Sequence, residues 1–285
     1  MYVFVQNQFV ESEKAVLHVS DLAIQRGYGI FDFFRVRDNV LLFVEDHLDR
    51  FLRSAAIMHL QPLLSKEKLL LVLQELAQRN NLPQSGIKMI LTGGYSPDAY
   101  QPATPNLIIS QTPLNIPDPE EPKTVNIITH EFMRDLPEAK TINYSMGIWL
   151  QKKIVDQHAD DVLYHTGGLV TEFPRCNFFI VDKNGVIITP DKNALPGITR
   201  KRILELAATQ YRIKEAPVLL SDVWQAKEAF LTSSTKRIQS IVSVGGRTIG
   251  NGKPGEVTGA LLKMLVDSEK SYVRQHQKIY NSISG

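Results

Sequence analysis

The sequence predicts an α+β protein with two domains. Its 285 residues are enough for two hydrophobic cores. Strand-like apolar runs and helix-like repeats occur in both halves, as in "IFDFFRVRDN" and "VEDHLDRFLRSAAIMHL". Between the halves, four prolines lie from Pro113 to Pro122, and their fixed φ and missing N–H donors predict an extended connection. We expect a small α+β domain at residues 1–112, an interdomain loop at 113–123 and a larger domain at 124–285.

Composition excludes several functional classes. The net charge is only +2, and Lys and Arg are interleaved with Asp and Glu, so a nucleic-acid partner is not expected. No apolar run reaches the roughly 18 residues of a membrane span. The N-terminal residues lack a signal-peptide pattern, so we expect a cytoplasmic protein. The single Cys176 rules out an internal disulfide and a cysteine-rich zinc site, and no metal is expected.

Hydrophobic periodicity gives the expected elements of each half. In the first half, strands are predicted at 1–10, 30–39, 40–46, 86–95 and 105–113, and helices at 44–60 and 65–81. In the second half, strands are predicted at 124–132, 161–166, 230–234 and 238–244, and helices at 145–159, 200–211, 220–230 and 255–280.

The stretch "LVTEFPRCNFFIVDKNGVIITPDKNALPGITR", residues 169–200, is the most informative. It reads as a strand, an irregular turn, a strand, a hairpin, a short strand and a helix start. Glu172 and Arg175 lie in the irregular turn, where a purely structural hairpin would carry Asn-Gly or Asp-Gly. A lone turn glutamate is most often a solvated carboxylate, and that alternative remains open from this residue alone.

A second feature of the same stretch favours a functional site over a solvated turn carboxylate. Gly197 gives a tight turn, and the free N–H groups of Ile198 and Thr199 begin a helix, which suits a phosphate. A carboxylate and a phosphate site in one supersecondary unit suggest a cofactor with a basic ring nitrogen and a phosphate. Pyridoxal 5′-phosphate has both.

This cofactor needs a lysine. Lys140 ends a polar stretch and precedes an apolar run, and desolvation there would favour its neutral amine. An ordinary surface lysine is an equal alternative from spacing alone. Arg50 is either a phosphate clamp or a helix-surface arginine paired with Asp46 or Asp49. Ser234 could add a hydroxyl to the same phosphate, although serines in such a turn are usually structural.

The run from Glu172 to Arg200 resembles the signature of the class IV aminotransferases, the fold-type IV pyridoxal-phosphate enzymes. The matching positions are Glu172, Asn177, Phe178-Phe179, Ile187-Ile188-Thr189 and Leu195-Pro196-Gly197-Ile198-Thr199-Arg200. The segments "RGYGIFDFFRV", "EDHLDRFLRSA", "AKTINY" and "LTSSTKRI" resemble other parts of the same family. The resemblance therefore covers most of the chain.

The resemblance implies a small N-terminal α/β domain, a larger C-terminal mixed β-barrel-like domain with helices, and a homodimer with active sites near the subunit interface. It implies that Lys140 forms the Schiff base with pyridoxal 5′-phosphate and that Glu172 keeps the ring nitrogen protonated. By the same resemblance, Tyr144 hydrogen-bonds the ring hydroxyl, and the phosphate is held by Arg50, Ile198, Thr199 and Ser234.

The substrate is less clearly indicated. Well-known D-amino-acid transaminases carry an Arg-x-His pair that "ILTGGYSPDAYQP" lacks, and branched-chain enzymes carry Thr-Ala-Ala where this chain has "SSTKRI". Arg26, Arg175 and Thr235 are the candidates for binding the substrate, and the two arginines would bind its carboxylates. The alternative for each arginine is a rim residue paired with an Asp or Glu.

A site that contains both Arg26 and Arg175 would favour substrates with two carboxylates over the apolar amino acids leucine and valine. We therefore expect a D-amino-acid transaminase that acts between D-glutamate or D-alanine and 2-oxoglutarate or pyruvate. The alternatives are an aminodeoxychorismate lyase, which eliminates pyruvate, a branched-chain L-amino-acid aminotransferase, and a binding protein without catalysis. The joint presence of Lys140 and Glu172 argues against the last.

Overall fold

The computed structural model describes residues 1–283, with side chains to residue 277. The chain divides into two compact units. Unit 1 contains Met1–Pro117, Ala139–Asn143 and the described residues from Glu269 onward. Unit 2 contains Asp118–Glu138 and Tyr144–Ser268. The expected division was contiguous, whereas unit 1 here recruits two segments from the second half of the chain.

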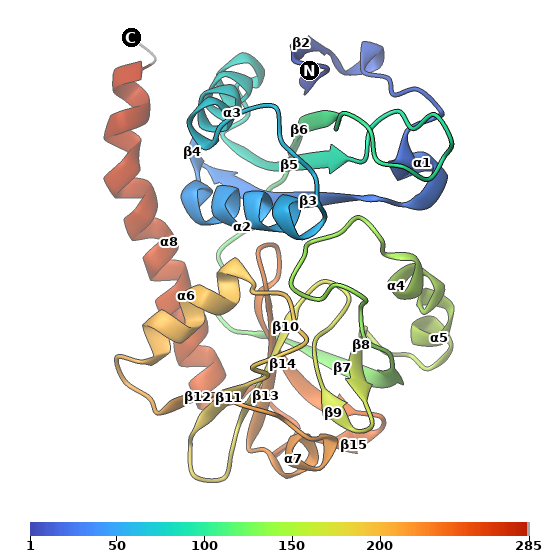
Figure 1. The fold of residues 1–285 in the computed structure, drawn as a ribbon. Coiled ribbons are helices and arrows are strands. Elements are labelled where there is room, and N and C mark those ends of the chain that lie inside the picture. The colour runs from blue at the N-terminus through green and yellow to red at the C-terminus, as the bar shows by residue number, and fades with distance from the viewer. Residues whose placement is uncertain (284–285) are drawn as a thin grey trace. The chain divides into compact units, whose positions relative to one another are not determined.

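Unit 1 is built on an antiparallel sheet of six strands in the order β2-β1-β6-β5-β3-β4 (Figure 1). The Gln6–Asn7 turn, with both residues at positive φ, splits the first predicted strand into a hairpin. The bounds of the strands are β1 (Tyr2–Val5), β2 (Gln8–Glu11), β3 (Gly29–Arg37), β4 (Val40–Leu41), β5 (Gln84–Thr92) and β6 (Leu107–Pro113).

One face of this sheet is covered by α2 (Val44–Ile57) and α3 (Lys66–Asn80) (Figure 1). The helical spacing seen in the sequence is confirmed, because Leu48, Phe51 and Ala55 of α2 are fully buried in the core of unit 1. Unit 1 also contains the short α1 (Leu22–Arg26) and a 3₁₀ turn, η1 (Ser12–Lys14).

The strand predicted at 40–46 is largely wrong. Only Val40 and Leu41 pair with β3, and Phe43 then adopts a left-handed conformation with φ of 53°. That turn redirects the chain into α2 at Val44.

The last helix, α8 (Glu256–Ile283), contributes to both units. Its residues to Ser268 belong to unit 2. From Glu269 onward it packs in unit 1, where the Glu269 carboxylate forms a buried ion pair with Arg35. Val273 adds an apolar contact with Val40 and Leu42. These contacts explain why the end of the chain does not belong to the expected C-terminal domain alone.

Unit 2 is built on a mixed sheet of nine strands in the order β12-β11-β10-β13-β14-β7-β8-β9, with β15 paired to β14. Strand β7 is parallel to both β14 and β8, and β11 is parallel to β12. The bounds are β7 (Lys123–Glu131), β8 (Asp161–Thr166), β9 (Leu169–Val170), β10 (Asn177–Val181), β11 (Ile187–Thr189), β12 (Ile213–Glu215), β13 (Glu228–Ser233), β14 (Arg237–Val244) and β15 (Arg247–Thr248).

Strand β10 is buried along its whole length, which explains the continuous apolar run "NFFIV". Phe178 and Ile180 enter one core of unit 2, and Phe179 and Val181 enter another that includes residues of α6 and α8. The helix predicted at 145–159 is divided at Leu150. The helices of this unit besides α8 are α4 (Ser145–Trp149), α5 (Gln151–Asp156), α6 (Ile198–Ala207) and α7 (Leu220–Gln225).

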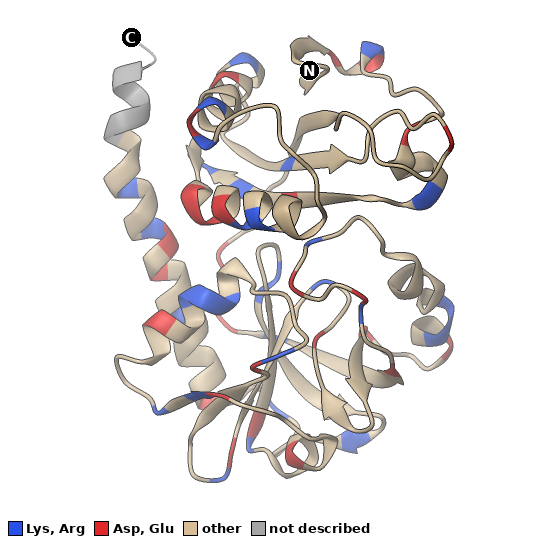
Figure 2. Cartoon of the chain, in the orientation of Figure 1, with Lys and Arg blue, Asp and Glu red and all other residues tan. Residues whose placement is uncertain are grey.

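Pro113 is the last residue of β6 and Lys123 the first of β7, and the proline-rich residues between them form no helix or strand, as the composition predicts. Basic and acidic residues are interspersed along both units (Figure 2). Within the described residues, no helix combines the length and the apolar character that a bilayer crossing requires.

Candidate active site

Glu172 is a buried carboxylate in the irregular turn between β9 and β10, and it is only 4% exposed. Its Oε1 atom accepts a hydrogen bond from Arg134 Nε at 2.7 Å, and its Oε2 atom accepts one from the Leu195 N–H at 3.0 Å. Arg134 also donates to the Pro137 carbonyl. A carboxylate held by two donors, one of them cationic, keeps a fixed orientation and can accept a further hydrogen bond.

Asn177 and Gly197 explain the spacing of the signature. Asn177 Nδ2 donates to the Leu195 carbonyl at 2.7 Å, so Leu195 is held by Glu172 on one side and by Asn177 on the other. A Cβ on Gly197 would lie 2.0 Å from Asn177 Oδ1, so only glycine allows this approach. The signature therefore describes one hydrogen-bonded cluster around the carboxylate.

The remaining signature residues have structural contacts. Thr189 Oγ1 donates to the Phe178 carbonyl at 2.7 Å, which ties β11 to β10. Arg200 Nη2 donates to the Pro190 carbonyl and to Glu215, each at 2.8 Å. Both residues hold the segment that leads into α6.

The N-terminus of α6 offers unused donors. Gly197 is the N-cap without a side-chain cap, and the first hydrogen bond of the helix runs from Lys201 N to the Gly197 carbonyl. The N–H groups of Ile198 and Thr199 make no hydrogen bond with any described residue. Opposite Asn177 on β13, the Thr232 hydroxyl is buried and also lacks a partner. Such unfilled donors fit a bound anion.

The turn between β13 and β14 carries the other predicted phosphate and substrate groups. Ser234 is half-buried and Thr235 is exposed at this turn. Ser233 Oγ accepts from the Lys236 N–H at 3.1 Å, and Lys236 Nζ pairs with Asp161 at 2.8 Å. These contacts fix the turn that presents the two hydroxyls.

Arg175 is exposed and lies within electrostatic range of Lys236 and Cys176. Among the described residues it has no ion pair or hydrogen bond, so the structure shows no acid paired with Arg175. Cys176 is buried next to it, and burial raises the pKa of the thiol to about 11. The thiol is therefore protonated at neutral pH and does not act as a nucleophile.

Lys140 belongs to unit 1 and is positioned through its backbone. Its N–H donates to Ser54 Oγ on α2 at 3.1 Å, and its carbonyl accepts from the Phe31 N–H on β3 at 2.8 Å. The side chain is partly buried, with Nζ 4.5 Å from the centre of the Phe31 ring. An aromatic ring at this distance removes water from one side of the amine.

Arg50 is buried rather than exposed, so its pairing with Asp46 or Asp49 is wrong. Its Nε and Nη2 atoms bind the two oxygens of Asp32 at 2.8 Å each. Only Nη1 lies outside this fork. Binding of a phosphate by Arg50 stays a prediction, since its strongest contact here is a carboxylate.

His47 completes this buried cluster. Its Nδ1 lies 2.7 Å from Asp32 Oδ1, and because a carboxylate only accepts, Nδ1 carries the proton. Burial lowers the pKa of His47, although Asp32 opposes the shift, so the ring is neutral at neutral pH. For Asp32, burial would raise the pKa, but Arg50 and His47 together hold it well below its usual value.

Two further predicted residues are Tyr144 and Arg26. Tyr144 is half-buried at the start of α4, in unit 2. Arg26 is exposed at the end of α1, in unit 1, where its Nη1 donates to the Gln25 carbonyl at 2.9 Å. Arg26 has no acidic partner among the described residues, and its role at a substrate site stays a prediction.

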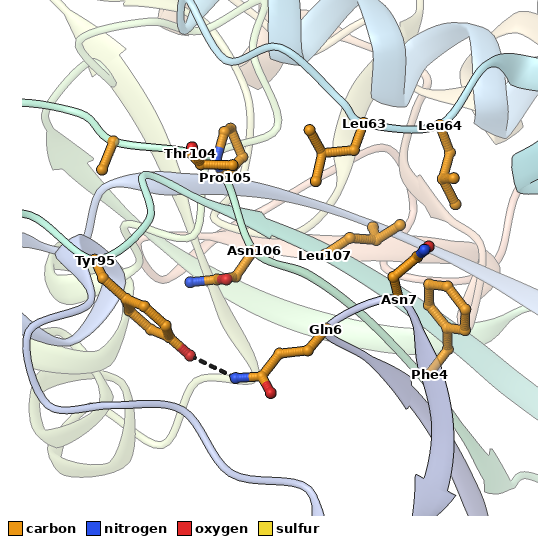
Figure 3. Close-up of a pocket in the computed structure, with 11 residues that line it drawn as sticks. Phe4, Gln6, Asn7, Leu63, Leu64, Tyr95, Thr104, Pro105, Asn106 and Leu107 are labelled. Atoms are coloured by element: carbon orange, nitrogen blue, oxygen red, sulfur yellow. Dashed lines mark hydrogen bonds between the residues drawn. The ribbon is translucent and has the colours of Figure 1, made fainter.

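A pocket of about 460 Å³ in unit 1 involves none of the predicted site residues (Figure 3). Its lining is mostly apolar, and a hydrogen bond of 2.8 Å from Gln6 to the Tyr95 hydroxyl crosses its edge. The lining residues are Phe4, Gln6, Asn7, Leu63, Leu64, Tyr95, Ala103, Thr104, Pro105, Asn106 and Leu107. It contains no candidate for the predicted chemistry.

Comparison with known proteins identifies the family. Residues 29–244 match the family described as amino-transferase class IV, which is well over half of the chain. The chain belongs to the class IV aminotransferases. The D-alanine aminotransferase of Bacillus licheniformis is 27% identical over 274 residues, with 94% of this chain and 97% of the relative covered. A D-alanine aminotransferase of Listeria monocytogenes is 30% identical over 279 residues, with 94% and 96% covered.

Other similar proteins carry a different name. A putative branched-chain-amino-acid aminotransferase of Methanocaldococcus jannaschii is 27% identical over 277 residues, with 94% of this chain and 96% of the relative covered. The structure of the Escherichia coli branched-chain amino acid aminotransferase has a TM-score of 0.85 at 23% identity, with 92% of both chains covered. This class IV aminotransferase therefore has the predicted fold-type IV architecture, and its substrate is not decided by similarity.

Class IV aminotransferases depend on pyridoxal 5′-phosphate, which confirms the predicted cofactor. The residues present fit this group. Glu172 offers a fixed carboxylate to a ring nitrogen, and the uncapped start of α6 offers donors to a phosphate.

The sequence analysis did not predict a role for Arg134. Its only signal was a basic residue six positions before Lys140, and spacing does not connect it to Glu172.

Arg134 is predicted to act through Glu172. Substitution Arg134→Met removes a charge-assisted hydrogen bond, so Glu172 would lose its fixed orientation. We expect cofactor affinity and kcat to fall by roughly 10- to 100-fold. Fluorescence titration of the apoenzyme with cofactor and steady-state kinetics measure the two effects. Arg134→Lys, which keeps the charge, should recover part of both. An Arg134→Met variant with unchanged affinity and kcat would contradict this role.

The buried neutral His47 predicts a pH-dependent stability. Its folded pKa is depressed, so below about pH 6.5 the unfolded chain binds a proton that the folded chain does not, and stability falls. The contribution reaches at most about 1.4 kcal/mol per pH unit. Urea unfolding between pH 5 and 7.5 should show a shallower slope for His47→Asn than for the wild type. The exposed His59 provides the control, and His59→Asn should keep the wild-type slope.

Proposed function

We propose that this class IV aminotransferase transfers an amino group between a D-amino acid, such as D-glutamate or D-alanine, and a 2-oxo acid, such as 2-oxoglutarate or pyruvate. The observation that carries this proposal is Arg175. It is an exposed arginine without an acidic partner, near the turn that presents Ser234 and Thr235. A guanidinium group in this state is available to a substrate carboxylate.

Arg26 supports the same substrate class from unit 1. It too has no acidic partner among the described residues. Two cationic side chains favour a substrate with two carboxylates and disfavour a pocket made for leucine or valine. D-alanine aminotransferases among the similar proteins support the D configuration.

The proposed roles of the cofactor-binding residues follow from their contacts. Bound pyridoxal 5′-phosphate supplies an electron sink for the carbanion formed at the substrate Cα. Lys140 would hold the cofactor covalently, and its Nζ would move the proton of the substrate Cα. Lys140 is partly buried, and its Nζ lies over the Phe31 ring.

Glu172 holds a proton on the ring nitrogen. Its carboxylate remains anionic because Arg134 and the Leu195 N–H both stabilise the charge. We assign the phosphate to the N–H groups of Ile198 and Thr199 and to Ser234, with Arg50 contributing Nη1. Tyr144 is assigned to the ring hydroxyl. A homodimer is part of this proposal, as the family resemblance implies.

The amino-acid panel tests the function. D-glutamate, L-glutamate and D-alanine are added separately to the purified holoenzyme, and the absorbance of the bound cofactor is followed. We expect the D-amino acids to convert the cofactor to its amine form and L-glutamate to leave it unchanged. The Lys140→Ala variant should show no conversion while keeping the folded circular-dichroism spectrum.

The other outcomes of the panel point to the alternatives. Conversion by L-glutamate alone would place the enzyme with the branched-chain aminotransferases. A bound cofactor that responds to none of the three would favour the aminodeoxychorismate lyase. If Lys140→Ala turned over like the wild type, the assignment of the lysine would be wrong.

Arg175 has its own prediction. Arg175→Gln removes the cation but keeps a polar side chain, so KM for D-glutamate should rise by roughly 10- to 100-fold with a smaller change in kcat. Arg175→Lys should restore part of the affinity. Arg274, an exposed arginine on α8, serves as the control, and Arg274→Gln should leave KM unchanged. A KM within twofold of the wild type for Arg175→Gln would remove Arg175 from the substrate site.

A further inference from the structure

Arg237, the first residue of β14, is a charged residue that is buried in a conformation favoured by glycine. It is only 2% exposed, and its backbone φ is 53°, in the left-handed region. Ser233 pairs with Arg237, so residues 234–236 form the turn between β13 and β14. In three-residue hairpin turns, the left-handed position usually carries glycine. An arginine kept at this position, against the backbone preference, indicates that its side chain has a use.

The buried guanidinium group of Arg237 binds the proline-rich connection between β6 and β7. Its Nη2 atom donates a hydrogen bond to Asp118 Oδ1 at 2.9 Å, and the Asp118 side chain is 26% exposed. Asp118 lies between Pro117 and Pro119, which restrict the backbone on both sides. Unit 1 ends at Pro117, and Asp118 begins the next segment of unit 2. Arg237 therefore holds the connection at the point where it enters unit 2.

The turn between β13 and β14 is also held by the residue that precedes Arg237. Nζ of Lys236 lies 2.8 Å from a carboxylate oxygen of Asp161, a buried residue of β8. Two consecutive residues thus attach the turn to two other parts of unit 2, β8 and the proline-rich connection. Ser234 and Thr235, which precede them, are the two residues that the proposed function assigns to the cofactor phosphate and the substrate.

We propose that Arg237 is a positioning residue, which keeps Ser234 and Thr235 in their binding orientation by tying the turn to Asp118. The inference rests on the proposed function, because that function assigns the two hydroxyls to ligands. The Arg237 guanidinium is buried against Asp118, so its effect on a ligand passes through the turn. A turn that is fixed before binding loses less conformational freedom when the ligand arrives, and its affinity is higher.

A role of Arg237 in the hairpin alone leads to a different expectation. Glycine adopts a φ of 53° without strain, so Arg237→Gly preserves the hairpin while it removes the tie to Asp118. If the arginine served only the hairpin, this variant would bind ligands like the wild type. If Arg237 positions the turn, the variant keeps the folded circular-dichroism spectrum and binds the phosphate more weakly.

The test compares two ligands that differ by the phosphate. The apoenzyme is titrated with pyridoxal 5′-phosphate and, separately, with pyridoxal, and fluorescence gives each Kd. We expect Arg237→Gly to weaken binding of pyridoxal 5′-phosphate by roughly tenfold and binding of pyridoxal by less than about twofold. Arg237→Lys, which keeps a cation, should recover part of the affinity. In kinetics of the holoenzyme, KM for D-alanine should rise in Arg237→Gly with a smaller change in kcat, because Thr235 belongs to the same turn.

Asp118→Asn tests the tie from its other end and leaves the sequence of the hairpin untouched. We expect it to weaken binding of pyridoxal 5′-phosphate in the same way as Arg237→Gly. Because both substitutions break one interaction, the double variant should bind no more weakly than Arg237→Gly alone. The control is Glu121, an exposed acid of the same proline-rich connection, and Glu121→Gln should bind both ligands like the wild type.

Three results would overturn the role of Arg237. They are wild-type affinity for pyridoxal 5′-phosphate in Arg237→Gly and Asp118→Asn, an equal loss for pyridoxal and its phosphate, and losses that add in the double variant. A wild type that converts no amino acid, with the Kd changes as expected, would overturn the proposed function and leave the tie in place. A wild type active on D-alanine whose Arg237→Gly variant keeps every Kd and KM would overturn this inference alone.

Discussion

A carboxylate withdrawn from water requires hydrogen-bond donors, and the arrangement of unit 2 around Glu172 provides them. Arg134 comes from the segment after β7, and the Leu195 N–H comes from the segment before α6. Asn177 holds the carbonyl side of Leu195, and Gly197 makes room for Asn177. The turn, the first residue of β10 and the start of α6 are thereby fixed relative to one charge.

Unit 1 also contains a buried carboxylate that hydrogen-bond donors stabilise, and there the carboxylate connects a helix to the sheet. Asp32 on β3 is neutralised by Arg50 and hydrogen-bonded by His47, both from α2, so a charged group joins the helix to the sheet. Lys140 is attached to the same two elements through its backbone. The backbone of the lysine that we propose to react is therefore held by both a helix and the sheet.

Sequence reasoning succeeded where the information was local. The helical spacing of Leu48, Phe51 and Ala55 predicted α2, and the spacing of Glu172, Asn177 and Gly197 predicted the family and its cofactor. It failed where the contact partner is distant in the chain. Arg134 is 38 positions from Glu172, and the two side chains meet only in the folded chain. The left-handed turn at Phe43 and the ion pair of Glu269 with Arg35 are likewise tertiary effects, without a repeat in the sequence.

The chain has one cysteine, and its thiol is buried and protonated at neutral pH. Thiol-directed reagents would therefore not react with the folded wild-type protein. A cysteine introduced at an exposed position of either unit would be the sole reactive group, and a pair of them would accept spectroscopic labels without prior removal of Cys176. Distances between two introduced labels can therefore be measured in solution during turnover without any other change to the wild-type sequence.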